Sequence, residues 1–173
     1  ESFRVAVQEK SGPVHLELPE DIAAEQTAVT PFPVTPIQKK LAAHEALEEA
    51  AEFIKKAKNP LLLIAAASNR RCAGPALEHF IEQTGIYFFS TQMGKGAASE
   101  FHSRCLGTAA LSDHDYLHCA IGKADVIINV GHDVVEKPPF FMRRDGLTVI
   151  HINHFHAVFD EVKTIVSMLF SGF

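Results

Sequence analysis

Two apolar segments of this chain run directly into short polar loops that contain glycine and that carry residue types suited to ligand binding. The first loop is Thr91-Gln-Met-Gly-Lys-Gly96, which follows the apolar residues 86–90. The second is Gly131-His-Asp133, which follows residues 126–130. In an open parallel sheet, ligands bind just outside the carboxyl ends of the strands. Two such strand ends in one short chain predict a nucleotide-sized binding site.

The loop Thr91–Gly96 differs from a Walker A loop. No glycine precedes Gly94 at the required distance, and Lys95 is followed by glycine instead of Ser or Thr. Two glycines around a lysine indicate a tightly turned backbone, and Met93 offers a polarizable surface for a flat ring. The alternative is a surface loop with one solvated lysine, and the residues alone leave both interpretations open.

Two further loops allow both a binding and a purely structural interpretation. Residues 65–71 read Ala-Ala-Ala-Ser-Asn-Arg-Arg, with alanines where a phosphate-binding loop usually has glycine. Their polar side chains could contact a dinucleotide, or the segment could be a tight strand–helix turn. His132 and Asp133 could hydrogen-bond a ligand or position each other, or they could simply cap the end of a strand.

The sequence displays no self-sufficient catalytic or metal-binding apparatus. It contains no GxSxG, HExxH or CxxC pattern. His114 and His118 lie four residues apart, and three more histidines cluster within residues 151–156. Zinc needs three or four convergent ligands with tetrahedral geometry, so these spacings do not predict a metal site. We therefore expect neither catalytic residues nor metal ligands in this chain.

Charge and composition argue against nucleic-acid and membrane partners. The net charge is -5 and the pI is about 6.0, whereas phosphate backbones require clustered Lys and Arg. No apolar run approaches the roughly 20 residues that span a bilayer. The three cysteines are widely spaced, which fits a reducing compartment and predicts a cytoplasmic location. The chain begins without Met or a signal peptide, so we expect it to belong to a longer protein.

The elements that must position these loops alternate regularly along the chain. Helical spacing of apolar residues predicts helices near residues 47–54, 77–84 and 117–124, and continuous apolar runs predict strands at 61–66, 86–90, 126–130 and 147–152. Strands separated by helices of this length require parallel pairing and right-handed crossovers. We therefore predict a three-layer α/β domain with a parallel, Rossmann-like sheet.

The chain divides into three predicted regions. Residues 1–24 contain the end of a helix at 3–7 and a half-buried strand at 14–18, which together cannot form a core. Residues 25–37 are rich in Pro and Thr and predict an extended linker. Residues 38–173 make up the α/β domain.

Several motifs give the chain a family resemblance that runs from about residue 3 to about residue 162. They are Gly12-Pro-Val-His-Leu-Glu-Leu-Pro-Glu-Asp-Ile22, Thr84-Gly-Ile86, Ser90-Thr-Gln-Met-Gly-Lys-Gly-Ala97, His102 with Leu106-Gly107, Ala124-Asp-Val-Ile-Ile-Asn-Val-Gly131 and Val149-Ile-His-Ile-Asn153. In combination they resemble the thiamine-diphosphate-dependent acetolactate synthase large subunit, mainly its central domain.

The resemblance implies that the parent protein is a transferase that decarboxylates and condenses 2-keto acids, usually two pyruvates to 2-acetolactate. Residues 1–24 would then be the end of its pyrimidine-binding domain, and 38–173 its central nucleotide-binding-like domain. Thiamine diphosphate and Mg²⁺ would bind outside this chain, to the pyrimidine- and pyrophosphate-binding domains that are its expected partners. The parent would be a homo-oligomer, and the chain alone would be inactive.

The resemblance also implies a structural FAD in this domain, as in the biosynthetic members of the family. Carried over by position, its contacts would be Ala66, Ala67, Asn69, Arg70, Thr91, Gln92, Met93, Gly94, Gly107, Thr108, Ala109, Ala110, Gly131, His132, Asp133 and Asn153.

Three segments depart from the family pattern. The glycine-rich first turn reads Ala65-Ala-Ala67, an expected Gly-Ala-Arg reads Gly131-His-Asp133, and residues 163–173 do not match the family's next strand. Three other functions therefore stay open. They are a cofactor-free scaffold and subunit interface, a regulatory site for ADP or a CoA moiety, and an NAD-dependent dehydrogenase. The last is the poorest, because no GxGxxG is present.

Overall fold

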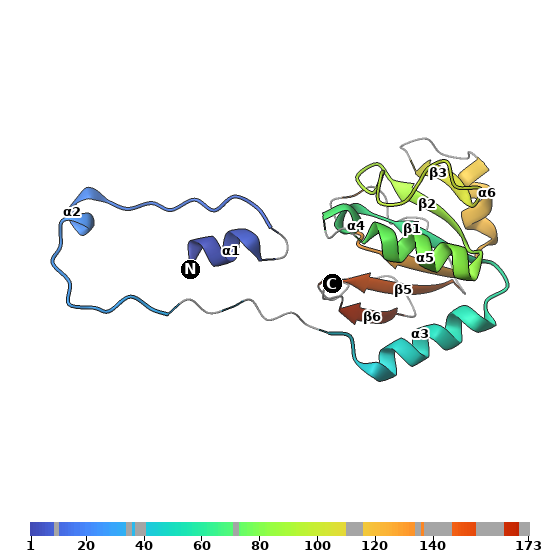
Figure 1. The fold of residues 1–173 in the computed structure, drawn as a ribbon, viewed down its shortest axis with the longest axis horizontal. Helices are drawn as coiled ribbons and strands as arrows, with labels where there is room; N and C mark the ends of the chain where they lie inside the picture. The colour runs from blue at the N-terminus through green and yellow to red at the C-terminus, as the bar shows by residue number, and fades with distance from the viewer. Residues whose placement is uncertain are drawn as a thin grey trace. The chain divides into compact units, whose positions relative to one another are not determined.

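The computed structural model describes residues 1–8, 11–33, 36, 41–70, 73–109, 116–133, 136, 147–154 and 165–169. The chain divides into two compact units, Glu1–Lys39 and Lys40–Phe173 (Figure 1). The division falls two residues beyond the Pro- and Thr-rich segment that the sequence predicts to be a linker.

The first unit holds two short helices and no buried residue among those described. Helix α1 spans Ser2–Val7 and helix α2 spans Glu20–Ala23. The strand predicted at residues 14–18 is wrong: this segment is neither helix nor strand, and its residues are exposed. An isolated strand has no ladder partner for its N–H and C=O groups, so its alternating pattern alone cannot form a sheet.

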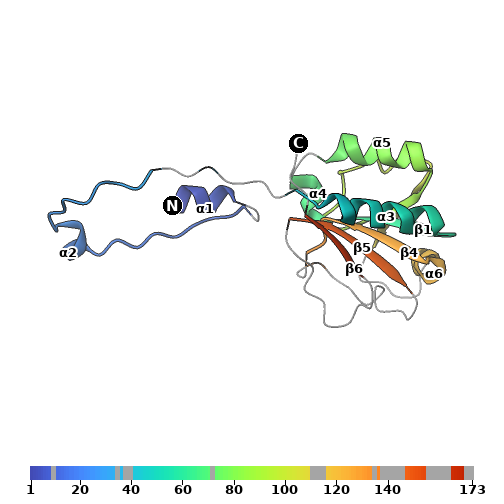
Figure 2. The same cartoon turned by 90° about the horizontal axis from the view of Figure 1, so that it is seen from below.

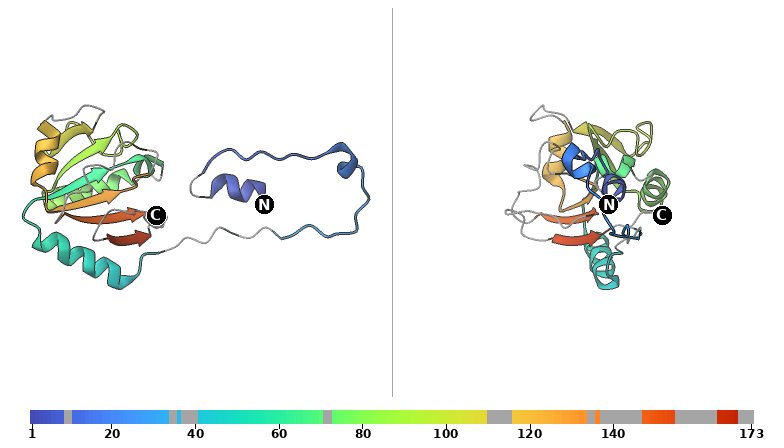
Figure 3. Two further views of the ribbon diagram at one scale, coloured as in Figure 1. Left: turned by 180° about the vertical axis from the view of Figure 1, so that it is seen from behind. Right: turned by 90° about the vertical axis from the view of Figure 1, so that its left-hand side faces the viewer.

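The second unit is built on one six-stranded, wholly parallel sheet with the order β3-β2-β1-β4-β5-β6 (Figure 1 and Figure 3). The strands are β1 (Pro60–Ile64), β2 (Tyr87–Thr91), β3 (Cys105–Ala109), β4 (Val126–Val130), β5 (Thr148–Asn153) and β6 (Ile165–Leu169). The order reverses between β1 and β4, which is the topological switch point of a doubly wound sheet. The predicted parallel, Rossmann-like class is therefore confirmed.

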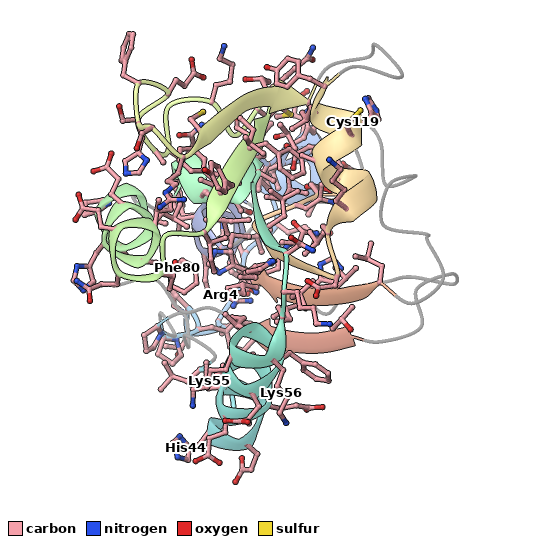
Figure 4. All side chains as sticks on the ribbon, turned by 90° about the vertical axis from the view of Figure 1, so that its right-hand side faces the viewer. Arg4, His44, Lys55, Lys56, Phe80 and Cys119 are labelled. Atoms are coloured by element: carbon pink, nitrogen blue, oxygen red, sulfur yellow. The ribbon has the colours of Figure 1, made fainter. Side chains whose placement is uncertain are left out.

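Helices cover both faces of this sheet and make the three layers. The helices are α3 (His44–Lys56), α4 (Ala66–Arg70), α5 (Gly74–Thr84) and α6 (Tyr116–Lys123). Helices α3 and α5 lie over one face (Figure 2). Helix α6 lies over the other, so that Phe80 on α5 and Cys119 on α6 mark opposite sides of the sheet (Figure 4).

Two apolar clusters join these layers. Leu62, Ile64 and Ile128 belong to the cluster beneath α3 and α5, where Ala50 and Leu77 also lie. The other face presents the alternate strand residues to Leu117 and Ile121 of α6; these residues are Leu61, Leu63, Phe89, Ile127 and Val149. Both faces of the central strands are buried, which explains their continuous apolar runs.

Strands β3 and β6 were not predicted from the sequence. Strand β3 reads Cys-Leu-Gly-Thr-Ala, is mostly half-buried and contains a glycine, so it has neither an apolar run nor clean alternation. Strand β6 falls in residues 163–173, where no strand was expected, yet Ile165–Leu169 pairs in parallel with β5 along its length. Of the helices that the structure describes, none is long and apolar enough to cross a membrane.

Helix α5 ends at Gly85, whose φ of 67° is in the left-handed region. Replacing Gly85 with Ala is expected to lower the free energy of unfolding by about 1 kcal/mol, because a Cβ disfavours this conformation. Gly122 is the matched control: it lies in α6 with nothing within 4 Å of an added Cβ. Ala there should stabilise the protein by about 0.5 kcal/mol. Urea denaturation of both variants measures their unfolding free energies. Equal changes in the two variants would contradict the left-handed conformation of Gly85.

Candidate functional site at the carboxyl ends of the central strands

The loops singled out in the sequence meet at one edge of the sheet, where β1, β2 and β4 end. Ala65 donates its N–H to the carbonyl of Val130 at 2.9 Å, and Ala67 donates to Gly131 at 3.0 Å. The Ser68 hydroxyl adds a third bond, to the Val130 carbonyl at 3.1 Å. The turn after β1 is therefore fastened directly onto the end of β4, across the switch point.

Two glycines allow this close approach. A Cβ on Gly131, which has φ of 73°, would lie 2.8 Å from the Ser68 nitrogen and 2.9 Å from the Ala67 Cβ. A Cβ on Gly94 would lie 2.2 Å from the Ile64 carbonyl oxygen. At both glycines the backbone of another segment occupies the space where a Cβ would lie. That space is therefore not open to a ligand.

The carboxylate of Glu136 lies at the centre of this edge and is only 4% exposed. Its Oε1 and Oε2 accept the N–H of Ala66 at 3.1 and 3.2 Å. Oε2 also accepts the N–H of Asp133 at 2.9 Å, and Oε1 accepts the hydroxyl of Thr91. One buried side chain therefore connects the ends of β1, β2 and β4.

The loop after β2 is held in the same way. The Thr91 hydroxyl accepts the N–H of Gly94 at 3.0 Å while it donates to Glu136. The Asn69 amide donates to the carbonyl oxygens of Met93 at 2.8 Å and Lys95 at 2.6 Å. The Met93 side chain is 56% exposed.

A buried polar row continues from this edge along β4 and β5. The Asn129 amide and the His151 Nδ1 lie 3.1 Å apart, and Asn153 donates to the carbonyl of His132 at 2.6 Å. Burial lowers the pKa of His132, against the opposing influence of Glu136 and Asp133. Burial, with a smaller contribution from His132, lowers the pKa of His151 to about 4. Both imidazoles are therefore neutral near pH 7.

The structure brings some of the predicted site residues together and separates others. Those at the shared edge are Ala66, Ala67, Asn69, Thr91, Gly94, Gly131, His132, Asp133 and Asn153. Gly107, Thr108 and Ala109 lie in the outer strand β3, which joins this edge through the Ser90 and Thr108 hydroxyls at 3.1 Å. The Gln92 and Met93 side chains are exposed. Ala110 and the Arg70 side chain lie outside the described residues.

Glu136 was missed as a site residue. Its signal was present as Asp133-Val-Val-Glu136, the Asp-x-x-Glu spacing of a capping box, immediately after a glycine-bearing strand end. One of the two bonds of a capping box is present, since the Glu136 side chain accepts the Asp133 N–H at 2.9 Å, while the Glu136 N–H donates to the Asp133 backbone carbonyl at 2.9 Å. The spacing would have placed a carboxylate at the switch point.

The described residues line two cavities outside the Glu136 hydrogen bonds, one of which reaches Val130 at the end of β4. One of about 490 Å³ opens at the amino ends of β1 and β2, with Lys58, Gly85 and Lys123 in its wall. The other, of about 270 Å³, is apolar and lies between α3 and α5. Within the described parts of the chain, no group of three or more His, Cys, Asp or Glu residues could hold a metal ion.

Comparison with known proteins identifies the class. A sequence model of the thiamine pyrophosphate enzyme central domain matches residues 47–170, well over half of the chain. The match includes residues 163–170, so the expectation that this segment departs from the family is wrong for most of its length. The chain therefore belongs to the thiamine pyrophosphate enzyme family and carries its central domain.

Individual relatives are more distant. The chain is 28% identical over 137 residues to the acetolactate synthase large subunit of Parasynechococcus marenigrum, covering 76% of this chain and 22% of that protein. It is 29% identical over 168 residues to the 3D-(3,5/4)-trihydroxycyclohexane-1,2-dione hydrolase of Clostridium tetani, covering 90% of this chain and 26% of that protein. The chain thus spans about a quarter of the length of the curated relatives it matches.

The fold agrees with a solved structure. Benzoylformate decarboxylase from Polynucleobacter necessarius superimposes with a TM-score of 0.71 at 20% identity, covering 96% of this chain and 32% of that chain. At this identity the likeness speaks for the fold alone.

Proposed function

We propose that this chain is the central domain of an acetolactate synthase-like enzyme, a transferase that decarboxylates and condenses 2-keto acids. The match of residues 47–170 to the family's central domain carries the proposal. The acetolactate synthase large subunits of Parasynechococcus marenigrum and of Escherichia coli, each 28% identical, support this reaction. Relatives also include a glyoxylate carboligase and a 2-hydroxyacyl-CoA lyase.

In such an enzyme, thiamine diphosphate with Mg²⁺ supplies the carbanion chemistry, and the protein supplies binding and orientation. The Gly-Asp-Gly motif of thiamine binding is not in this sequence. We assign the cofactor to the neighbouring pyrimidine- and pyrophosphate-binding domains. The role of this chain is to hold those domains in a fixed arrangement. We place the parent enzyme in the cytoplasm, as a homo-oligomer.

The first unit supports a role in joining domains. Phe3 and Phe32 are each 91% exposed, and Leu16 is 74% exposed. The exposure of these large apolar side chains, in a unit with no buried residue among those described, supports contact with another part of a protein. We assign residues 1–24 to the end of the pyrimidine-binding domain and residues 25–37 to the linker that follows it.

The purified 173-residue chain is expected to turn over no pyruvate when thiamine diphosphate and Mg²⁺ are supplied, because the groups that hold thiamine lie elsewhere. The measurement is acetolactate formation, with the longer protein that includes the flanking domains as the positive control. Activity of the chain alone, or a longer protein that makes no carbon–carbon bond between 2-keto acids, would contradict the proposal.

The residues present do not fit FAD, the cofactor that the resemblance implies for this domain. A dinucleotide at the switch point needs free backbone N–H donors for its diphosphate. Here the N–H groups of Ala66 and Asp133 already bind the carboxylate of Glu136. Our proposal is therefore a domain that acts as a cofactor-free scaffold, and no step of the reaction passes through a flavin.

A further inference from the structure

The switch point of a doubly wound sheet is the place where this fold binds the diphosphate of a dinucleotide. The diphosphate is a compact anion, and it is recognised by N–H and O–H donors that converge from neighbouring strand ends. In this protein the donors that converge at the switch point are the N–H of Ala66, the N–H of Asp133 and the hydroxyl of Thr91. All three are directed at one group.

That group is the Glu136 carboxylate, and both of its oxygens are engaged. Oε1 accepts from Ala66 and Thr91, and Oε2 accepts from Ala66 and Asp133. The side chain is 4% exposed, and Thr91 and Asp133 are 3% and 4% exposed. A carboxylate taken out of water is tolerated when donors satisfy it in this way.

We propose that Glu136 is a built-in anion, whose carboxylate takes the position of a dinucleotide diphosphate and closes the switch point to FAD and ADP. The inference rests on the cofactor-free scaffold proposed above and deepens it, because it names the residue that closes the site. It does not depend on the proposed reaction of the parent enzyme. Glu136 acts here as a positioning residue that locks three strand ends together.

Electrostatics opposes an incoming diphosphate. It would either approach a buried carboxylate of the same sign or displace it, and displacement would leave the Glu136 charge without its donors. Both outcomes are unfavourable for a buried charge.

Packing adds a second barrier. The Gly131 backbone lies against the turn at Ala67 and Ser68, and Gly94 lies against the Ile64 carbonyl. The space beside these glycines, which a ligand would need, is therefore occupied by other parts of the backbone. The Ala67 N–H is also engaged, since it donates to the Gly131 carbonyl at 3.0 Å. A diphosphate would have to separate β1 from β4 before it found a donor there.

The first test is a titration of the purified chain with FAD and with ADP, followed by flavin absorbance of the desalted protein and by the thermal unfolding midpoint. We expect a colourless protein and no shift of the midpoint with either ligand. Retained flavin, or a saturable rise of the midpoint with ADP, would overturn the proposal. Because this readout involves no turnover, it is independent of whether the parent condenses 2-keto acids.

The second test is chemical rescue of Glu136→Ala, with Glu82→Ala on the exposed face of α5 as the matched control. The cavity left by Glu136 retains three donors, so acetate should raise the midpoint of this variant saturably. Chloride at equal ionic strength should not, and neither wild type nor Glu82→Ala should respond to acetate.

Acetate that raises all three midpoints equally, or none of them, contradicts a specific anion position. If Glu136→Ala does not fold, Glu136→Gln is compared at the same salt concentrations. Its amide keeps the size of the side chain and loses the charge, so it should melt below wild type without acetate rescue. A Glu136→Gln midpoint equal to wild type would overturn the role of the charge.

Discussion

Replacing Glu136 with alanine is expected to lower the free energy of unfolding by about 3 kcal/mol. The change leaves the N–H of Ala66, the N–H of Asp133 and the hydroxyl of Thr91 without the acceptor that they share. Each buried donor left unsatisfied costs about 1–3 kcal/mol. Release of the desolvated carboxylate offsets part of that sum, which is why the expected loss is near its lower end.

Chemical denaturation of the purified variants measures this loss. Glu82→Ala, on an exposed helical face, should stay within about 0.5 kcal/mol of wild type. Glu136→Asp is informative as well, because it keeps the charge but is one methylene shorter and should lose part of the stability. A Glu136→Ala variant as stable as Glu82→Ala would mean that the carboxylate does not hold the strand ends together.

Acidification from pH 7 to pH 4 is expected to remove about 3 kcal/mol of stability through His151. Burial lowers the pKa of this imidazole from 6.5 to about 4 in the folded protein, and each pKa unit corresponds to about 1.4 kcal/mol. Between these two values the unfolded chain binds more protons than the folded one, so stability falls as the pH falls. The loss begins near pH 6.5 and levels off below pH 4. His132, whose pKa is also lowered, acts in the same direction.

Unfolding free energies measured by denaturant at several pH values between 4 and 7 check this expectation. His151→Gln removes the titrating group, so the unfolding free energy should fall less between pH 7 and pH 4. The variant should also be less stable than wild type at pH 7, because it loses the contact with Asn129. His79→Gln, at an exposed position on α5, should leave the acid limb of wild type unchanged. Stability that rises toward acid, or an equally steep fall in His151→Gln, would contradict the assignment.

The order of the central elements could be predicted because their signals are local. Apolar runs such as residues 61–66 and helical spacing such as 77–84 reflect burial on both faces of a sheet and on one face of a helix. Strand β3 could not be predicted, since its pairing with β2 includes a register irregularity and its sequence contains glycine. Strand β6 reads Ile-Val-Ser-Met-Leu, a short apolar run that carries a local strand signal, and its pairing with β5 places it at the edge of the sheet.

The fold class predicts that the loops lie close together, but it does not predict the hydrogen bonds between them. Parallel strands place their carboxyl ends at one edge, so Thr91 and Gly131 were expected to lie near each other. The bond between Glu136 and Ala66 spans 70 residues, and no local pattern specifies such a contact. The converse error, a strand at residues 14–18, arose because alternation describes a face and does not supply a pairing partner.

The most direct measurement is an FAD titration of the isotope-labelled chain, followed at the amide resonances of Ala66 and Asp133. These two N–H groups bind the Glu136 carboxylate, and a diphosphate at the switch point would have to take them over. We expect both resonances to stay in place throughout the titration. Saturable shifts of both would show that the dinucleotide reaches the site, and would contradict a switch point closed by the protein's own carboxylate.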